Sequence, residues 1–262
     1  MELLNYVFFQ NALVGVLLIS VACAVVGVYV VTRRMVFIAG GITHTCFGGL
    51  GLGYYLGWNP IAMATAFAVA GGLSVNALSR SRVRSDSAIA VVWAIGMALG
   101  ILFVFLTPGY VPELNSFLFG NVLNISHVDL WLFAAFALVA IAVYAVWGRI
   151  IVAVSFDEDF ARTRYLPVST VNTAMMVLVA VGIVLMIKMV GVMLLMSLIS
   201  LPQMTAERLT RRYSGMMVVS GIVAAITCLG GLWLAVWIDV PASAVIVLLQ
   251  AAAYGVATAC RR

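Results

Sequence analysis

Long apolar stretches that carry almost no charge are the feature that most constrains how this chain can fold. Of its 262 residues, 65% are apolar and 9% are charged, whereas a soluble domain carries about 25% charged residues. Water would solvate such a surface poorly, but lipid tails accept it, because helices satisfy their own backbone hydrogen bonds. We therefore expect an all-α, polytopic membrane protein that forms one transmembrane domain over residues 1–262.

Apolar runs between charged residues or Gly/Pro breaks indicate where the chain crosses the bilayer. Each crossing needs about 20 mainly apolar residues, which predicts about nine (eight to nine) transmembrane helices. The expected spans are 7–31, 35–57, 60–79, 86–107, 128–148, 169–187, 189–206, 214–237 and 241–260. Only Lys188 and Gly191 mark a turn between the sixth and seventh of these. The count falls if that pair forms one broken or re-entrant element.

The basic residues predict the orientation. Alternation through these spans places every arginine on one face, whereas Lys188 falls on the opposite face. Basic loops stay in the cytoplasm, so we expect the N-terminus outside and the C-terminus inside a bacterial inner membrane. The net charge of +5 reflects this bias and gives no reason to expect nucleic-acid binding.

The stretch 37–53 contains the most informative polar residue. Small residues recur there every four positions and let membrane helices approach closely; they are Gly41, Thr45, Gly49 and Gly53. His44 lies beside this face, and its neighbours one turn away include Gly40, Gly41 and Gly48. A mid-span ionisable residue usually faces a cavity or a partner, and imidazole binds zinc, copper, iron and nickel.

His44 is therefore the candidate metal ligand, and Gly40, Gly41, Thr45 and Gly48 are candidates to line a pathway. An equally good reading is a neutral histidine that donates to a nearby carbonyl and locks two helices together. The residues alone do not separate these alternatives.

A methionine stripe follows helical spacing further along the chain, at Met186, Met189, Met193 and Met196. Thioethers are soft metal ligands, but methionine also fills gaps in cores, and packing is the favoured interpretation. Met193 is nevertheless a candidate to line the pathway. Pro202 predicts a kink that would suit a gate or simple packing. The four cysteines lie in expected spans without ligand spacing and are interpreted as buried structural thiols.

The segment 155–168 has a different character from the spans. Three acidic residues begin a helical stretch and two arginines end it, which complements the helix dipole. Phe156 and Phe160 fall on one edge, which predicts docking into a partner groove or onto the lipid surface. The chain has no GxxxxGK[ST] motif, so any ATP hydrolysis must occur in another polypeptide. The segment 110–121 is expected to form a short outer helix or gate, or an ordinary interfacial loop.

Three motifs in order carry a family resemblance: Arg33 to His44 with its glycine-rich tail, Phe156 to Arg162, and Val190 to Ala206. Over nearly the whole chain, the sequence resembles the permease family of zinc, manganese and iron ABC importers. The resemblance implies a type II importer permease, not itself an enzyme and without a permanently bound cofactor. It also implies a second copy of the chain, two ATP-binding cassette subunits and an extracytoplasmic metal-binding protein.

The resemblance further assigns roles to residues. Within the cytoplasmic coupling helix segment 155–168, the ATPase contacts would be Asp157, Glu158, Phe160, Ala161 and Arg162. Pro202 would act at the gate, and Glu113 would help to dock the binding protein.

Two departures from the family pattern stand out. Many members carry an aspartate one turn before the histidine, and this chain has Gly40 there. Loss of a hard carboxylate favours zinc over manganese, with manganese or iron as alternatives. The second departure is Gln203-Met204, where the family often has Pro-Ala-Ala-Thr-Ala.

Two other classes of function were weighed. A secondary, ion-coupled metal transporter without an ATPase usually has carboxylates along its path, and no Asp or Glu falls in the middle of an expected span. An intramembrane enzyme would need a paired nucleophile and base or a HExxH-type helix, and the sequence has neither.

Overall fold

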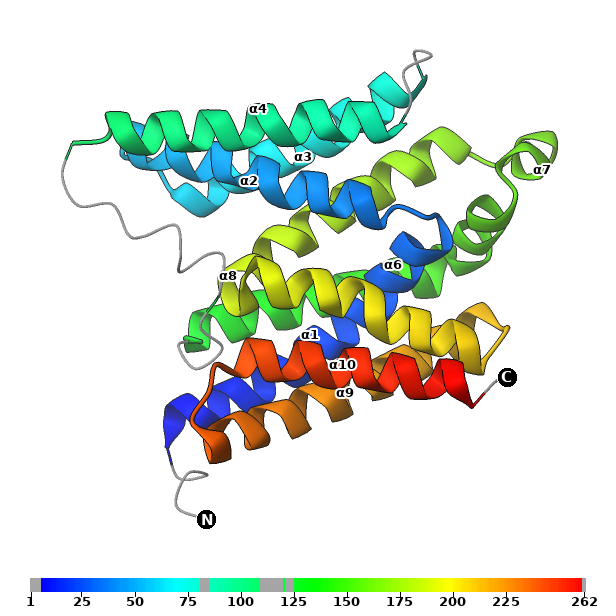
Figure 1. The fold of residues 1–262 in the computed structure, drawn as a ribbon. Helices are drawn as coiled ribbons and strands as arrows, with labels where there is room; N and C mark the ends of the chain where they lie inside the picture. The colour runs from blue at the N-terminus through cyan, green and yellow to red at the C-terminus, as the bar shows by residue number, and fades with distance from the viewer. Residues whose placement is uncertain (1–5, 81–84, 109–119, 121–124, 261–262) are drawn as a thin grey trace.

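The computed structural model describes residues 6–80, 85–108, 120 and 125–260, and helices account for almost all of them (Figure 1). The all-α prediction is confirmed. The helices are α1 (Val7–Thr32), α2 (Val36–Leu56), α3 (Pro60–Arg80), α4 (Ser85–Leu106), α6 (His127–Phe156), α7 (Glu158–Thr163), α8 (Val168–Leu209), α9 (Tyr213–Ile238) and α10 (Ala242–Ala259).

Seven helices in the described part of the chain are long and apolar enough to cross a membrane. The expected count of eight to nine is therefore slightly too high by this criterion. The apolar part of α3 is shorter, at Pro60–Val75, and the two spans expected at 169–187 and 189–206 form the single element α8. The span expected to end at residue 148 continues to Phe156. Arg149 lies within this helix and is exposed, because a long arginine side chain can carry its charge out to water.

A sharp break at Gly191 divides α8 into two arms. Gly191 has φ 78° and ψ 169°, a conformation in which the helical hydrogen-bond pattern cannot continue and which is nearly restricted to glycine. The first arm (168–190) and the second arm (192–209) leave this point toward the same end of the molecule (Figure 1). At a rise of about 1.5 Å per residue they are about 34 Å and about 27 Å long. One helical element therefore passes twice through the thickness of the bundle.

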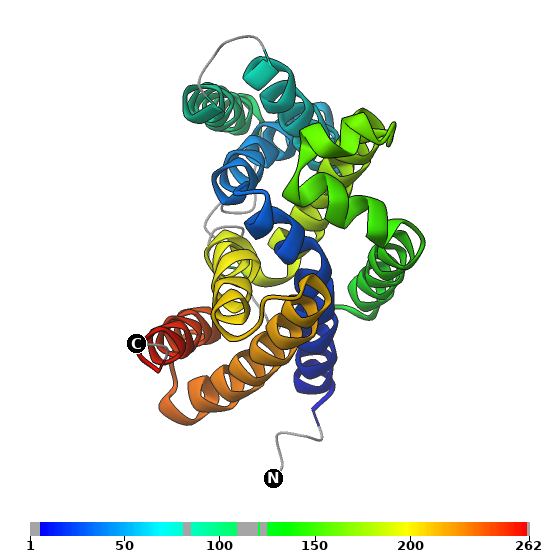
Figure 2. The ribbon, with the colours of Figure 1, turned by 90° about the vertical axis from the view of Figure 1, so that its right-hand side faces the viewer.

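The helices form two groups that α8 joins. In one group α2 packs closely against α3 and α4, and in the other α1 packs against α6 and α9. The two groups lie at opposite sides of the molecule, and α8 lies between them and contacts both (Figure 2). Large side chains buried where these elements meet include Tyr29, Ile42 and Leu198. This arrangement places α2, which carries His44, against the second arm of α8.

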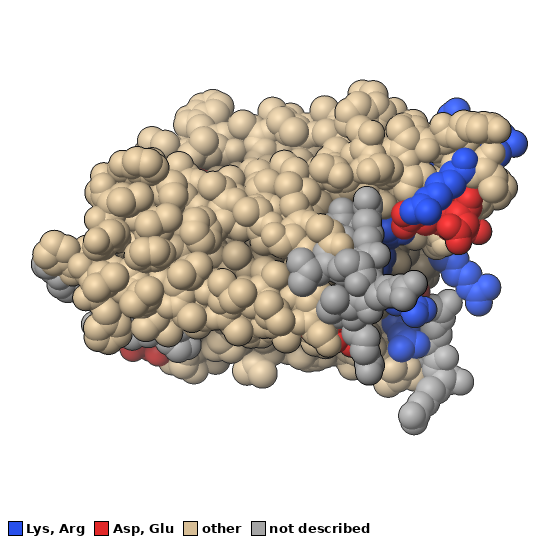
Figure 3. All heavy atoms as spheres, turned by 90° about the horizontal axis from the view of Figure 1, so that it is seen from above, with Lys and Arg blue, Asp and Glu red and all other residues tan. Residues whose placement is uncertain are grey.

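Charged side chains gather at one end of the molecule. On the face seen in Figure 3, arginines cluster at the end that carries α7 and the C-terminus, and most of the remaining surface is uncharged. The N-terminus lies at the opposite end (Figure 1). The segregation follows the pattern that the sequence predicts, whereas the assignment of the arginine end to the cytoplasm stays a prediction.

The backbone at Gly191 gives a direct test of the break in α8. A Gly191→Ala substitution forces a side chain into a conformation that costs about 1–3 kcal/mol, so we expect thermal unfolding in detergent several degrees below that of the wild type. The matched control is Gly230→Ala in α9, where an added Cβ meets nothing within 4 Å. Equal unfolding temperatures for the two variants would show that the break at Gly191 is not required.

Candidate metal site and coupling segment

Glycines on α2 bring the backbones of three helices into contact. A Cβ on Gly49 would lie 2.3 Å from the carbonyl oxygen of Met63 on α3, and one on Gly51 would lie 2.5 Å from that of Gly100 on α4. No side chain fits at such distances. The close helix approach expected from the small residues of this stretch is therefore confirmed, and it fixes α4 directly beside the histidine.

His44 lies against an aromatic ring of α4. Its imidazole stacks on Trp93 with ring centroids 4.0 Å apart and planes inclined by 10°, and Phe47 lies 6.1 Å away. The Nδ1 atom of His44 is buried, and it has no hydrogen-bond partner among the residues that the structure describes. A buried polar atom without a partner costs free energy. The alternative in which Nδ1 donates to a nearby carbonyl and locks two helices is therefore not what the described residues show.

The other predicted pathway residues on α2 lie in two environments. Gly41 packs against Ile89 of α4, and Gly48 would place a Cβ 3.0 Å from the carbonyl oxygen of Gly96. Thr45 donates to the carbonyl oxygen of Gly41 at 2.8 Å and lines a groove of about 330 Å³ between α3 and α4. Gly40 instead faces Met196 and Trp93. A role of these residues in lining a pathway stays a prediction.

The methionine stripe divides at Gly191. Met186 and Met189 on the first arm of α8 are 0% and 3% exposed and belong to the core. Met193 on the second arm is 46% exposed, and Met196 is partly buried. The four methionines therefore do not form one stripe, because the chain changes direction at Gly191 between the two pairs. Packing accounts for the first pair, whereas the second pair lies near the surface.

The second arm of α8 also contains Pro202 and Gln203. Backbone angles around Pro202 stay helical and the break lies at Gly191, so a gating role of Pro202 stays a prediction. Gln203 is fully buried, and its Nε2 donates to the carbonyl oxygen of Cys23 at 2.8 Å. A Cβ on Gly27 would lie 2.4 Å from that Nε2, so glycine is required opposite the amide. Gln203 thus ties α8 to α1.

The coupling segment predicted at 155–168 forms the short helix α7. Asp157 caps it, because its carboxylate accepts from the backbone N–H of Phe160 at 2.8 Å. Ala161 is fully buried under the helix, whereas Phe156 and Phe160 are 67% and 56% exposed. Phe156 at the end of α6 and Phe160 on α7 thus present exposed rings around the buried Ala161, a surface suited to a partner groove.

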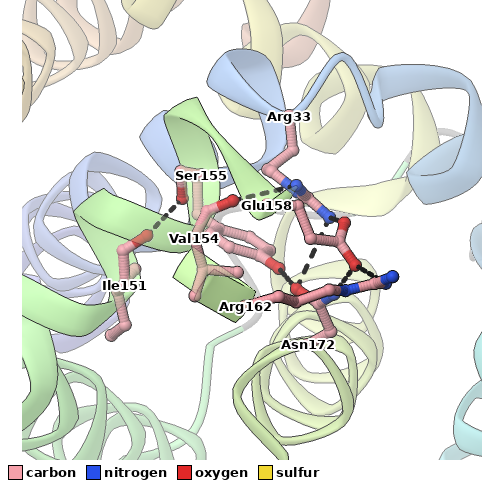
Figure 4. A network of polar contacts seen from close by, with 8 residues as sticks. Arg33, Ile151, Val154, Ser155, Glu158, Arg162 and Asn172 are labelled. Carbon is pink, nitrogen blue, oxygen red and sulfur yellow. Dashed lines mark hydrogen bonds and ion pairs between the residues drawn. The ribbon is translucent and has the colours of Figure 1, made fainter. Parts of the chain in front are cut away.

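A polar network holds α7 against three other helices (Figure 4). Arg33, at the end of α1, donates to the carbonyl oxygen of Val154 on α6 and to the carboxylate of Glu158, both at 3.0 Å. Arg162 donates to the same carboxylate at 2.7 Å, and Asn172 on α8 donates to it at 3.3 Å. The carboxylate of Glu158 therefore joins α7 to the ends of α1 and α8.

Glu158 is the ionisable centre of this network. Burial raises the pKa of its carboxyl, but the hydrogen bonds and charges of Arg33 and Arg162 outweigh burial and hold the pKa below its usual value. Sequence reasoning assigned Glu158 to the coupling segment but missed Arg33 and Asn172 as its partners. The position of Arg33 directly after a span was visible in the sequence, whereas the pairing across more than 100 residues was not.

The opposite end of the bundle contains a second ion pair. Lys188 on α8 donates to Asp129 on α6, and Asp129 also closes a capping box with Ser126. The sequence placed both charges on the same face, and the structure brings them together. Glu113, predicted to dock a binding protein, lies outside the described residues, as does most of the outer segment 110–121.

The described part of the chain, with seven helices long and apolar enough to cross a membrane, defines a multi-pass membrane protein. The model of the ABC 3 transport family matches residues 5–261, and the chain belongs to this family. It is therefore a permease subunit of an ABC transporter and not itself an enzyme.

Similar proteins cover the whole chain. The "uncharacterized membrane protein slr2045" of Synechocystis sp. is 36% identical over 100% of this chain and 93% of its own length. The manganese transport system membrane protein MntC of Halalkalibacterium halodurans is 29% identical, covering 98% and 88% of the two chains. A probable iron transport system membrane protein of Haemophilus influenzae is 30% identical, covering 99% and 96%. The solved structure of PsaBC from Streptococcus pneumoniae in complex with Fab has the same fold, with TM-score 0.87 and 24% identity over 98% and 92%.

The Glu158 network predicts a pH-dependent stability. The pKa of the Glu158 carboxyl is lower in the folded protein, so its pairs stabilise the fold above the usual pKa of about 4.3 and lose this effect as the pH falls through the folded value. Glu158→Gln should cost about 1 kcal/mol at pH 7, since the pairs are partly exposed. The difference in unfolding temperature from the wild type should shrink below about pH 4.3.

The control for this experiment is Asp159→Asn, which removes an exposed carboxylate from the same helix. It should change the unfolding temperature little at either pH. A Glu158→Gln effect that stays constant from pH 7 to pH 3 would rule out the carboxylate charge as its source.

Proposed function

We propose that this protein is the permease subunit of an ATP-driven importer of divalent metal ions in a bacterial inner membrane. The proposal rests on membership of the ABC 3 transport family and on the two sites described above, His44 within the bundle and α7 at its arginine-rich end. Each site supports a different half of the activity, metal passage and coupling to ATP hydrolysis.

The observation that carries the metal proposal is the unpartnered imidazole nitrogen of His44. A neutral imidazole inside a membrane-length helix is a metal ligand with borderline softness. Because one such nitrogen holds an ion only weakly, it can bind the ion during passage and then release it. A second His44 from another copy of the chain, water or nearby side chains would complete the coordination.

Relatives transport different metals, so the family alone does not select one. One relative is named for manganese and another for iron. In this chain Gly40 stands one turn before His44, so the carboxylate that manganese prefers is missing at that position. We infer that zinc is the favoured cargo, with manganese and iron as weaker substrates.

The surfaces of the molecule support the proposed partners. The exposed rings of Phe156 and Phe160 would fit a groove of each ATP-binding cassette subunit. Two copies of the chain would form the pathway between them, and an extracytoplasmic metal-binding protein would deliver the ion at the opposite end, with Glu113 among its contacts. In this orientation the arginine-rich end is cytoplasmic, the N-terminus is outside and the C-terminus is inside.

A secondary metal transporter without an ATPase is the competing function. It would need ionisable groups along the path to carry the coupling ion. In the described residues, Asp129 is engaged by Lys188 and Glu158 by Arg33 and Arg162, and α7 presents the exposed ring of Phe160. These features favour coupling through a partner protein.

Loss of the imidazole should abolish metal passage and leave assembly intact. In proteoliposomes containing the permease with its ATPase and binding protein, His44→Ala should lower ATP-dependent zinc uptake at least tenfold, because the ion loses its ligand inside the bundle. Copurification of the ATPase should be unchanged. Full uptake by the variant would make His44 a structural residue.

Removal of the exposed Phe160 ring from α7 should instead weaken assembly of the permease with its ATPase. Phe160→Ala should weaken copurification of the ATPase about tenfold, since a buried aromatic anchor contributes about 1–2 kcal/mol to an interface. The matched control is Trp237→Ala, which removes an exposed ring from the C-terminal end of α9. Equal recovery of the ATPase with both variants would remove α7 from the coupling interface.

A further inference from the structure

Met196 occupies the space beside His44 that a side chain at position 40 would enter. A Cβ on Gly40 would lie 3.2 Å from Cε and 4.0 Å from Sδ of Met196. Gly40 stands one helical turn before His44, and residues at this spacing have Cβ atoms about 5–6 Å apart. The thioether of Met196 on α8 therefore lies within one side-chain length of the His44 imidazole on α2.

Trp93 closes the same small region from the α4 side. Its ring stacks on His44 with centroids 4.0 Å apart, and its Cζ3 atom lies 3.9 Å from the Cβ position of Gly40. Met196, His44 and Trp93 thus surround one spot from three helices. Two of the three offer a metal ligand, a thioether sulfur and the unpartnered Nδ1.

We propose that Sδ of Met196 is the second protein ligand of the transported ion, beside His44, and that this pair selects borderline-soft divalent ions such as zinc over manganese. The inference rests on the proposed function, because it names a further ligand and the metal class of that same site. Thioether and imidazole both suit zinc, whereas manganese prefers carboxylate and water.

The geometry leaves a short movement to complete the site. A sulfur and a ring nitrogen that share one zinc ion lie no further apart than the sum of the two metal–ligand bonds, of which Zn–N is about 2.0–2.1 Å. Methionine has three rotatable side-chain bonds and a flexible thioether, so rotation of the Met196 side chain moves the sulfur toward the ring. A neutral thioether also binds more weakly than a thiolate, and this suits release of the ion.

Packing alone is the competing explanation for Met196. Met186 and Met189 are enclosed in the core, whereas Met196 packs against the core with part of its surface exposed. Met196 is only partly buried and lies one turn from the exposed Met193, on the arm of α8 that passes α2. The Cβ position of Gly40, one of the glycines one turn from His44, lies 4.0 Å from the sulfur of Met196.

The test compares two methionine variants on the same helix. Met196→Leu keeps the volume of the side chain and removes the sulfur, whereas Met189→Leu removes a sulfur from the enclosed core. In the assembled transporter in proteoliposomes, we expect Met196→Leu to lower the ratio of zinc to manganese uptake about tenfold. Met189→Leu should leave this ratio at the wild-type value. A wild-type ratio in Met196→Leu, with transport retained, would overturn the inference and leave the proposed function intact.

Zinc K-edge absorption of the zinc-loaded permease gives a readout that does not depend on transport. The wild type should show a sulfur neighbour in the first shell of the zinc ion, and Met196→Leu should lose it while nitrogen neighbours remain. A zinc shell without sulfur in the wild type would overturn the inference. Absence of zinc binding and of zinc and manganese uptake in the wild type would instead contradict the proposed function itself.

Discussion

The hydrocarbon of a bilayer offers no hydrogen-bond partners, and the rest of the structure depends on this constraint. It explains why almost every described residue is helical and why the one sharp break, at Gly191, is covered by protein. Gly120 lies so close to this break that a Cβ would stand 2.2 Å from the carbonyl carbon of Val190. Two glycines therefore meet where the chain reverses, and α8 can return through the bundle without leaving that turn exposed to lipid.

Close helix contact also determines where polar chemistry can occur. Because α2 has little side-chain volume on one face, α4 approaches until backbone meets backbone at Gly51 and Gly100. This approach stacks Trp93 on His44, and it leaves an imidazole nitrogen without a partner in the described residues. The tight packing of α2 and the buried position of His44 beside Trp93 therefore have the same origin in the glycine-rich sequence.

Periodicity and charge predicted the helical class, most span positions, a short helix within 155–168 and the location of His44 among closely packed helices. They failed where the determining contact joins distant segments. The reversal at Gly191, by contrast, lies where a turn between two spans was expected. Arg149 was expected in a loop, because the sequence does not show that its long side chain is exposed from within a helix. The pairing of Glu158 with Arg33 and Asn172, and the approach of Met196 to Gly40, depend on tertiary packing that no local pattern encodes.

The same network that fixes α7 is also connected by a short segment to the helix that carries the candidate ligand His44. Arg33 is bound to Glu158 and to Val154, and only Arg34 and Met35 separate it from the first residue of α2. Arg34 has a positive φ of 55°, so this connection is a tight turn with little slack. Asn172 ties the same carboxylate to the first arm of α8. A displacement of α7 would therefore act at once on the helix that carries His44 and on the element that carries Met196. Because packed helices shift as rigid bodies between discrete arrangements, we expect such a displacement to change the distance between the two candidate ligands.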